Sequence, residues 1–321
     1  MSEAELIDDI WRAFGPLVAP GAYDFVDDAA MIPPLLTSSA GERARVITTD
    51  VVVEGVDFDR ALYPLVYAGF RALAQNLSDV ASMGAVPTGF VWSLALPPTW
   101  SRDDVGELAR GAAILAKLRK VPLFGGDLSS MPAGSSASIA ITAFGDVTGL
   151  PIRRSTALVD DDVFLLAPNA LGASAAGLRL LRARPSSAPF DAWLRALAVD
   201  EAACVSAHIK PLPADGALLV HARASACIDL SDGLAKDADR LARASGVSLA
   251  LDGTALASVT AAGATRDEAL HGGEDYALVF TSSSRAAAER VGAVHIGRAR
   301  AGQGVLVDDA PLAPQGFDHF P

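Results

Sequence analysis

The chain has 321 residues, of which 51% are hydrophobic, and it carries 26 basic against 38 acidic side chains, a net charge of −12. This length exceeds what one hydrophobic core usually supports, so two domains are predicted. The apolar content excludes a disordered chain. The acidic balance lacks the basic footprint of a nucleic-acid-binding protein, so no nucleic-acid partner is expected.

Three features of the sequence bear on the cellular compartment of the protein, and they agree with one another. The two cysteines, Cys204 and Cys227, form neither a metal-binding spacing nor a disulfide framework, which indicates a reducing compartment. The first 14 residues are acidic and amphipathic, unlike a secretory signal. The long uncharged stretch 80–101 is interrupted by prolines and glycines, which argues against a membrane span. A cytoplasmic protein without membrane contact is therefore expected.

The predicted elements mix helices and strands without an internal repeat. In chain order they are a helix at 1–14, a strand at 45–53, a helix at 62–82, a strand at 91–96, a helix at 103–118 opened by Ser101, a short apolar run at 121–124 and a strand at 138–147. A turn at 149–154 suggests a boundary between domains 1–149 and 150–321. The second half continues with a strand at 163–166, helices at 173–182, 191–206 and 216–226, a strand at Ile228, a helix at 234–244, and strands at 248–251, 277–280 and 294–296. This succession indicates an α+β or α/β protein.

Several familiar catalytic motifs are missing. None of the four lysines follows a glycine, so a Walker A loop is excluded, and neither GxGxxG nor HExxH occurs. The stretch Gly172-Ala-Ser174-Ala-Ala176 only half resembles a nucleophile elbow. The five histidines show no metal-ligand spacing. A serine hydrolase or a zinc enzyme is therefore disfavoured.

Acidic residues follow or interrupt apolar segments repeatedly. They are Asp27-Asp28, Asp50, Asp79, Asp127, Asp229 and Asp232, and hydroxyl groups stand beside several of them at Thr48, Thr49, Ser78 and Ser231. Two carboxylates about 4 Å apart repel by roughly 4 kcal/mol at an effective dielectric near 20. A convergent cluster must therefore be protonated or must recruit cations. Mg²⁺ suits carboxylate and hydroxyl oxygens and exchanges its waters for phosphate, so a multi-magnesium phosphate site is one interpretation.

Each of these acidic stretches also has a plainer explanation. The segment CIDLSDGLAKD, residues 227–237, is typical of a capped helix N-terminus. Asp79 could be an exposed helix residue that shares a face with Asn76. Asp127 could be a turn carboxylate, although the two glycines before it would let a backbone approach a phosphate closely. Residues 272–275, Gly-Gly-Glu-Asp, allow the same two interpretations.

Taken together, the segments decide between these interpretations. The chain resembles thiamine-monophosphate kinases in ten segments that occur in the family's order: VDDAAM, ITTDVVVEGVDF, RALAQNLSDVASMGAVP, LFGGDLS, RRS, GASAAGL, HIKPLP, IDLSDGLAKD, LHGGEDYALVF and GFDHF. The resemblance implies the two-domain fold of aminoimidazole ribonucleotide synthetase, in which N-terminal domains of two subunits pair into a β-barrel. It also implies a homodimer that transfers the γ-phosphoryl group of ATP to thiamine monophosphate.

The resemblance assigns roles to individual residues. It implies Mg²⁺ ligands at Asp28, Thr48, Thr49, Asp50, Asp79, Asp127 and Asp229, with a further metal at Asp232. Among these ligands the catalytic set is Asp28, Asp50, Asp79, Asp127 and Asp229. The implied ATP contacts are Gly126, Asp127, Arg154 and Ser231. The implied thiamine phosphate contacts are Glu274 and Phe317, and position 57 is a third.

The chain departs from the family pattern at Asp57, where the family usually has a histidine that meets the acceptor. Val26 and Leu128 also replace the usual glycine and threonine. Because of Asp57, a magnesium- and nucleotide-binding regulator without catalysis stays open as an alternative. Sister enzymes of the same fold are less compatible: no cysteine or lysine precedes Lys117, as selenophosphate synthetases require, and the chain lacks the terminal cysteine of hydrogenase-maturation relatives.

Overall fold

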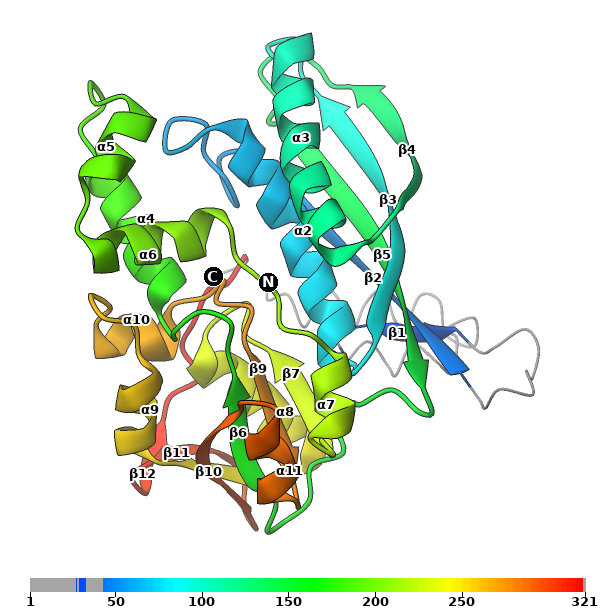
Figure 1. Ribbon diagram of the computed structural model, residues 1–321, viewed down its shortest axis with the longest axis vertical. Helices are drawn as coiled ribbons and strands as arrows, with labels where there is room; N and C mark the ends of the chain where they lie inside the picture. The colour runs from blue at the N-terminus through cyan, green and yellow to red at the C-terminus, as the bar shows by residue number, and fades with distance from the viewer. Residues whose placement is uncertain (1–26, 28, 33–42, 320–321) are drawn as a thin grey trace.

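The computed structural model describes residues 27, 29–32 and 43–319 (Figure 1). The helix expected at 1–14 and the predicted ligand Asp28 lie outside the described residues. Within the described ranges, no helix is both long enough and apolar enough to cross a membrane. The cytoplasmic location stays a prediction of the sequence.

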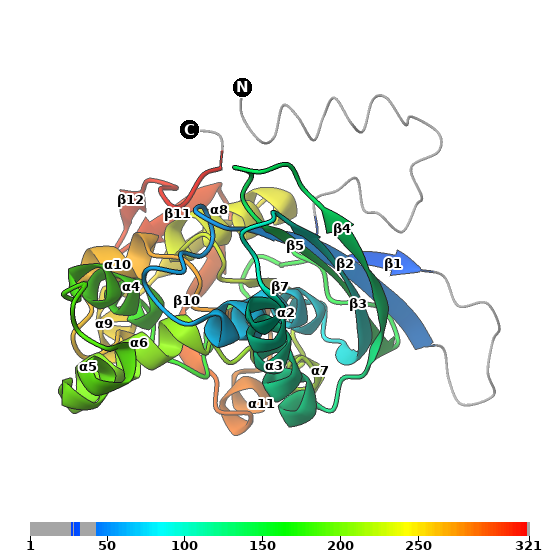
Figure 2. The ribbon, with the colours of Figure 1, turned by 90° about the horizontal axis from the view of Figure 1, so that it is seen from above.

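The first half of the chain forms a five-stranded sheet in the order β1-β2-β5-β3-β4. Its strands are β1 (Ala30–Ile32), β2 (Arg43–Val53), β3 (Val86–Leu96), β4 (Leu123–Ser130) and β5 (Ser138–Thr148). Side chains of β5 alternate strictly between buried and half-exposed, as expected for a sheet with one covered face. Two helices, α2 (Leu65–Ser82) and α3 (Arg102–Arg119), cover that face (Figure 2).

Helices α2 and α3 pack unusually closely because two glycines face each other's backbones. A Cβ atom on Gly69 would lie 1.9 Å from the carbonyl oxygen of Leu108, and one on Gly111 would lie 1.7 Å from that of Val66. Both distances are far below a van der Waals contact, so only glycine allows this approach. The close packing fixes α2 against the sheet, and α2 carries much of the site described below.

The second half forms a seven-stranded sheet in the order β12-β11-β8-β10-β6-β9-β7. Its strands are β6 (Asp162–Leu166), β7 (Ala226–Asp229), β8 (Ser248–Leu251), β9 (Leu278–Ser282), β10 (Val294–Arg300), β11 (Gly304–Val307) and β12 (Ala310–Leu312). The helices are α4 (Ala173–Ala183), α5 (Phe190–Ala196), α6 (Val199–Ile209), α7 (Ala217–His221), α8 (Leu234–Ser245), α9 (Gly253–Val259), α10 (Arg266–His271) and α11 (Arg285–Arg290). The central strands are buried throughout, which explains their continuous apolar runs.

Packing crosses between the two halves. Leu181 of α4 and Val205 and Ile209 of α6 belong to the same hydrophobic cluster as α2 and α3. Helix α2 also contacts β7 of the second sheet, so it lies where the two halves meet (Figure 1). The division into domains 1–149 and 150–321 stays a prediction, because a shared cluster joins residues on both sides of it.

Three expected elements differ from the structure. The helix expected at 216–226 is shortened to α7, which ends at His221, and Ala226 already begins β7. The helix expected at 191–206 is broken into α5 and α6, because Leu197 and Ala198 are extended and the Glu201 carboxylate accepts a hydrogen bond from the Ala198 N–H at 3.1 Å. The Gly-Gly-Asp segment lies inside β4, where Gly126 and Asp127 pair with Trp92 and Ser93. The alternative that Asp127 lies in a turn is therefore wrong.

Candidate functional site

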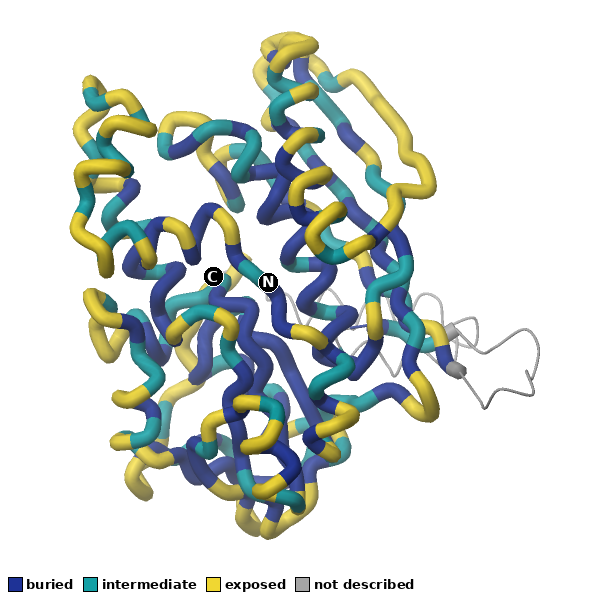
Figure 3. Tube along the Cα trace, in the orientation of Figure 1, coloured by how far each residue is buried: buried dark blue, intermediate teal, exposed yellow. Residues whose placement is uncertain are grey.

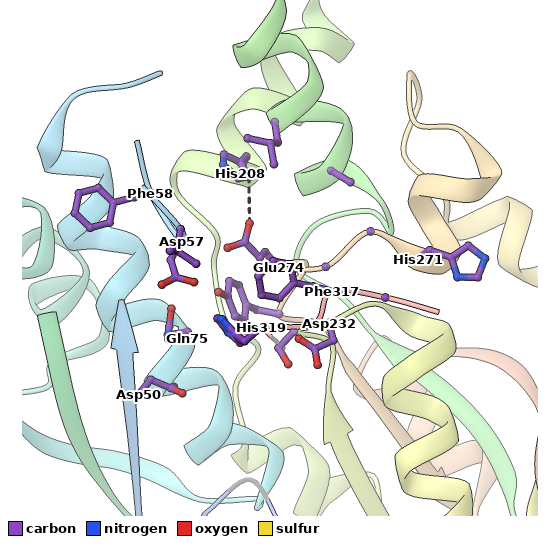
Figure 4. Close-up of a pocket in the computed structure, with 18 of the residues that line it drawn as sticks. Asp50, Asp57, Phe58, Gln75, His208, Asp232, His271, Glu274, Phe317 and His319 are labelled. Carbon is purple, nitrogen blue, oxygen red and sulfur yellow. Dashed lines mark ion pairs between the residues drawn. The ribbon is translucent and has the colours of Figure 1, made fainter. Parts of the chain in front are cut away.

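A pocket of about 870 Å³ lies between the two halves of the molecule (Figure 4). Its walls come from β2 and the loop after it, from helices α2, α4, α6 and α8, from the loops that follow β7 and α10, and from the C-terminal segment. The predicted site residues that line it are Asp50, Asp57, Asp79, Asp229, Ser231, Asp232, Glu274 and Phe317. Side chains separated by more than 250 positions in the sequence thus share one cavity.

One face of α2 supplies polar side chains to this region. Arg71, Gln75, Ser78 and Asp79 follow the i, i+4, i+7, i+8 spacing of a single helical stripe. Asp79 accepts a hydrogen bond of 2.7 Å from the hydroxyl of Thr48 in β2. The Ser78 hydroxyl donates a hydrogen bond of 2.6 Å to Asp229. The stripe therefore links the first sheet to the second at the floor of the pocket.

The turn after β7 carries three predicted site residues. Asp229 is the last residue of the strand and is 2% exposed, and Ser231 and Asp232 follow it into the pocket. The Asp232 carboxylate lies 2.8 Å from Nη1 of Arg240 and 3.1 Å from Nζ of Lys236. This corner of the pocket therefore combines a carboxylate with two cationic groups from the first two turns of α8.

The same turn is held by a residue that the motif did not single out. Helix α8 begins after Gly233, which has a φ of 121° and makes no capping bond through a side chain. Instead, Oδ2 of the buried Asp237 accepts hydrogen bonds from the N–H groups of Asp232 and Gly233, at 2.9 and 3.0 Å. Burial, together with the charge of Asp232, raises the pKa of Asp237 to about 7. The expectation that the preceding Asp and Ser side chains cap this helix is wrong, and they face the pocket instead.

A neighbouring part of the pocket, in direct contact with the Asp232 corner, is formed by Glu274, Phe317 and the 53–57 turn. Glu274 has a φ of 64°, and its N–H donates to the carbonyl of Ser231 at 2.8 Å. The C-terminal segment reaches this end because the Phe317 N–H donates to Asp232 O at 3.1 Å and Lys236 donates to Phe317 O. Figure 4 shows Phe317 beside Glu274, with His319 close by. An aromatic face and a carboxylate therefore lie together in the cavity.

Comparison with known proteins gives this pocket its context. Over 268 residues, which are 80% of this chain and 76% of the relative, the sequence is 36% identical to the thiamine-monophosphate kinase of Synechococcus elongatus. The chain belongs to the thiamine-monophosphate kinase family. The family model for the N-terminal domain of AIR synthase related proteins also matches residues 26–147. The predictions of a kinase and of the family are thereby confirmed.

Solved structures agree with the predicted fold of this kinase. The structure of AaThiL complexed with AMPPCP and TMP superimposes on this chain with a TM-score of 0.82 and 29% sequence identity. The match covers 99% of this chain and 97% of that chain. HypE of E. coli, a hydrogenase maturation protein, matches with a TM-score of 0.62 and 20% identity, over 99% of this chain and 97% of that chain. At this identity the similarity supports only the fold. The predicted aminoimidazole ribonucleotide synthetase-like fold is confirmed, and the dimeric barrel stays a prediction.

Not every predicted residue of the kinase lines the pocket. Thr49 lies next to Thr48 and Asp50 in β2, so its side chain points to the opposite face of the sheet, where it donates to Ile141 O at 3.0 Å. Asp127 lies on the exposed strand β4 and points to the same face as Thr49. Gly126 and Arg154 also lie outside the pocket lining. The sequence could not separate these groups, because register and sheet face are set only by tertiary pairing.

Binding of Mg²⁺ by the kinase depends on the oxygen ligands that the pocket offers. Within residues 27, 29–32 and 43–319, no three His, Cys, Asp or Glu side chains lie close enough to hold a metal ion by themselves. Magnesium usually takes one or two protein carboxylates and completes its shell with waters and substrate phosphates. Asp50, Asp79 and Asp229 are carboxylates that line one cavity. This donor set fits magnesium ions that arrive with a nucleotide.

Several residues at the site were not anticipated. Arg71, Gln75 and His208 line or border the pocket. Asn76, which was expected to share a helix face with Asp79, is fully buried and donates to Ala72 O at 3.0 Å. Asp79 itself is half-buried and lines the pocket, so the alternative that it is an exposed helix residue is wrong. The usable signal was the spacing of polar residues 71, 75, 78 and 79, which marks one helical stripe.

The position that departs from the family has a local explanation. Asp57 lines the pocket, and its Oδ2 accepts a hydrogen bond of 2.7 Å from the N–H of Val53. The carboxylate thereby closes the turn that ends β2. The backbone N–H group of Val53 thus holds the Asp57 carboxylate at the position where the family usually has a histidine.

Proposed function

We propose that the protein transfers the γ-phosphoryl group of ATP to the phosphate of thiamine monophosphate, giving thiamine diphosphate and ADP. The observation that carries this proposal is that Asp50, Asp79 and Asp229 share one pocket with Glu274 and Phe317. Carboxylates suited to metal-bound phosphates thus lie beside groups suited to a cationic heteroaromatic ring. The similarity to AaThiL complexed with AMPPCP and TMP supports this assignment.

The main obstacle to the reaction is repulsion between two phosphates. An oxygen of the acceptor phosphate attacks the γ-phosphorus, and the bond from that phosphorus to the bridging oxygen of ADP breaks. The acceptor is already an anion, so no strong general base is required. Magnesium ions, held by Asp50, Asp79 and Asp229 and by Asp28 and Thr48, would supply the positive charge that screens the phosphates. The protein's part is to hold both anions in line.

Two adjoining parts of the pocket take different parts of the substrates, and we call the part with Glu274 and Phe317 the acceptor end. Lys236 and Arg240 bring positive charge to the corner where Ser231 and Asp232 lie, which suits the nucleotide phosphates. Glu274 and Phe317 suit the positively charged thiazolium and the flat rings of the acceptor. Asp57, held by Val53, would contribute negative charge to the acceptor end rather than the hydrogen bonds of a histidine.

We also propose that two copies associate through the first sheet. Strand β4 is an edge strand in which every residue is exposed (Figure 3), and Leu123, Phe124 and Leu128 are about half to two-thirds exposed. A long apolar edge strand is unfavourable in water unless a partner covers it. A second copy over this face would also enclose the outward-facing Thr49 and Asp127. Those residues, with Gly126, would then act on the nucleotide at the subunit interface.

The direct test is to incubate the purified protein with ATP, Mg²⁺ and thiamine monophosphate and to measure thiamine diphosphate and ADP. Equal amounts of the two products support the proposal. ATP binding without acceptor-dependent ADP release would overturn it in favour of the non-catalytic regulator. Replacing the acceptor with other phosphate monoesters, including aminoimidazole-type substrates, would reveal a sister activity.

A further inference from the structure

Arg71 is a buried arginine that joins four separated segments at the acceptor end of the pocket. It lies in α2 with 4% of its surface exposed. Its Nη1 donates to His208 O at 2.6 Å, and its Nη2 lies 3.4 Å from Asp57 O and forms an ion pair with Oε1 of Glu274. The guanidinium also lies 5.9 Å from the ring centre of Tyr63. The sequence motifs assign acceptor contacts to Glu274 and position 57, but they assign no role to Arg71 or His208.

A buried guanidinium needs such partners, because an unpaired charge in the interior is very unfavourable. Burial opposes the charged form of Arg71, but the Glu274 carboxylate, together with Tyr63 and Tyr276, outweighs burial and raises the pKa of the arginine above its usual value. The charge is therefore permanent. An arginine that only joined the two halves of the molecule could bond backbone carbonyls alone. Arg71 instead directs its Nη2 group to the Glu274 carboxylate, which faces the pocket.

Glu274 sits in a backbone conformation that needs support. Its φ of 64° is in the left-handed region, which costs a non-glycine residue about 1–2 kcal/mol. Tyr276, two residues later, has a φ of 47°. Hydrogen bonds from the N–H groups of Glu274 and Tyr276 to the carbonyls of Ser231 and Leu230 hold the backbone. The side chain is held separately, by Arg71.

His208 does not replace Arg71 as the partner of Glu274. Burial, and then the charge of Arg71, lowers the pKa of His208 well below its ordinary value, so the ring is neutral. Its Nδ1 lies 3.0 Å from the Ser174 hydroxyl and 3.5 Å from Oε2 of Glu274 (Figure 4). The longer distance exceeds that of a normal N–H···O hydrogen bond. One carboxylate oxygen of Glu274 is therefore fixed by Arg71, and the other keeps the capacity to accept a bond from a ligand.

We propose that Arg71 is a positioning residue for acceptor recognition: by fixing Oε1 of Glu274, it presents Oε2 to the cationic ring system of the acceptor. This inference rests on the proposed function. It assigns selectivity for a positively charged heteroaromatic phosphate over a neutral one to the Arg71–Glu274 pair. Arg71 itself does not contact the reacting phosphates in this arrangement.

The test uses a double-mutant cycle with Arg71→Lys and Glu274→Ala. Lysine keeps the charge but loses the planar fork, so the acceptor KM should rise about 10-fold. The ATP KM and kcat should stay within about 3-fold, because the nucleotide corner is untouched. Since Arg71 acts through Glu274, the double variant should have the acceptor KM of Glu274→Ala alone. Arg119→Lys is the matched control, because Arg119 also joins the two halves, through Pro213 O, away from the pocket.

A glutamine at position 274 gives an independent test that keeps Arg71 intact. If Arg71 fixes one oxygen, Glu274→Gln must turn its amide oxygen to the guanidinium and its NH2 group to the pocket, where it faces a cation. The acceptor KM of Glu274→Gln should then exceed that of Glu274→Ala. The comparison of Glu274→Gln with Glu274→Ala therefore tests the role of Arg71 even if Arg71→Lys fails to fold.

Three results would overturn the inference while leaving the proposed function intact. The first is an unchanged acceptor KM in Arg71→Lys. The second is an equal rise of the acceptor KM and the ATP KM in that variant. The third is a lower acceptor KM in Glu274→Gln than in Glu274→Ala. Failure of the unmodified protein to make thiamine diphosphate would instead overturn the proposed function. The two failures are thus distinguished by the activity of the unmodified protein.

Discussion

The hydroxyl of Ser78 donates a hydrogen bond of 2.6 Å to the carboxylate of Asp229, and both residues are almost completely buried. This contact joins α2, which packs on the first sheet, to the end of β7 in the second sheet. It sets the direction in which the Asp229 carboxylate enters the pocket. Hydrogen bonds to a charged group contribute about 1.5–3 kcal/mol to stability.

Ser78→Ala should therefore lower the free energy of unfolding by about 1.5–3 kcal/mol, because the buried carboxylate loses a donor. Turnover should also fall, since Asp229 would no longer be held toward the pocket. Urea denaturation and steady-state kinetics measure the two effects. Ser258→Ala is the control, because that hydroxyl bonds only Ala255 O in a helix far from the pocket. Equal stability of the two variants would contradict this account of the contact.

Asp50→Asn should lower turnover by about 100-fold or more, the usual effect of losing an electrostatic group that acts at the transition state. The residue is half-buried at the pocket wall, and asparagine has nearly the same shape, so the protein should stay folded. Circular dichroism and product formation are the measurements. Asp103→Asn, at an exposed position in the first turn of α3, should have normal turnover. Near-normal activity of Asp50→Asn at saturating Mg²⁺ would rule out its role as a ligand.

Asp275 should give the stability of this protein a distinctive pH dependence. Burial raises its pKa to about 7, although the N–H groups of Gly172 and Ser174 donate to it. An unfolded aspartate titrates near pH 4, so between about pH 4 and pH 7 the folded protein binds more protons than the unfolded chain. The free energy of unfolding should therefore fall as pH rises through this range, by up to about 4 kcal/mol from this group.

Asp275→Asn removes that titration and should abolish this part of the pH slope, although it should also lower stability at every pH. Urea unfolding between pH 4.5 and pH 8 measures both profiles. The buried neutral His208 has the opposite effect below about pH 6.5, but it is present in both proteins. The difference between the two profiles therefore isolates Asp275. Parallel profiles would show that its carboxyl group titrates normally.

Leu128→Glu should convert the proposed dimer into a monomer, because it places a charge on the exposed edge strand β4. Light scattering after gel filtration measures the mass. Turnover should fall with the loss of the dimer, since Thr49 and Asp127 lie on the face that a second copy would cover. Val199→Glu, at a still more exposed position that begins α6, is the control. A monomeric unmodified protein at micromolar concentration would refute the proposed assembly.

Much of the fold was predictable because strong local signals coincide with tertiary structure. The strand at 138–147, the helix opened by Ser101 and the helix at 234–244 were all predicted to within a few residues. The short strands β11 and β12, at one side of the second sheet, were missed because they lack sustained apolar alternation. The break between α5 and α6 was missed because residues 191–206 are good helix formers, and only the local bond from Ala198 to Glu201 marks it.

For the candidate site, the sequence by itself determined which residues have the right chemistry. The placement of acidic residues at the ends of apolar segments identified Asp50, Asp79 and Asp229 as candidates, and the structure brings all three to one pocket. Only the tertiary structure decided that Thr49 and Asp127 face the other side of the sheet, because one position along a strand reverses the side chain. It alone also revealed the role of Arg71, since an arginine in a helix gives no sign of the pocket-facing carboxylate that it meets 203 positions later. Local sequence sets the chemistry and periodicity of each element, whereas pairing and packing between distant elements decide which groups meet.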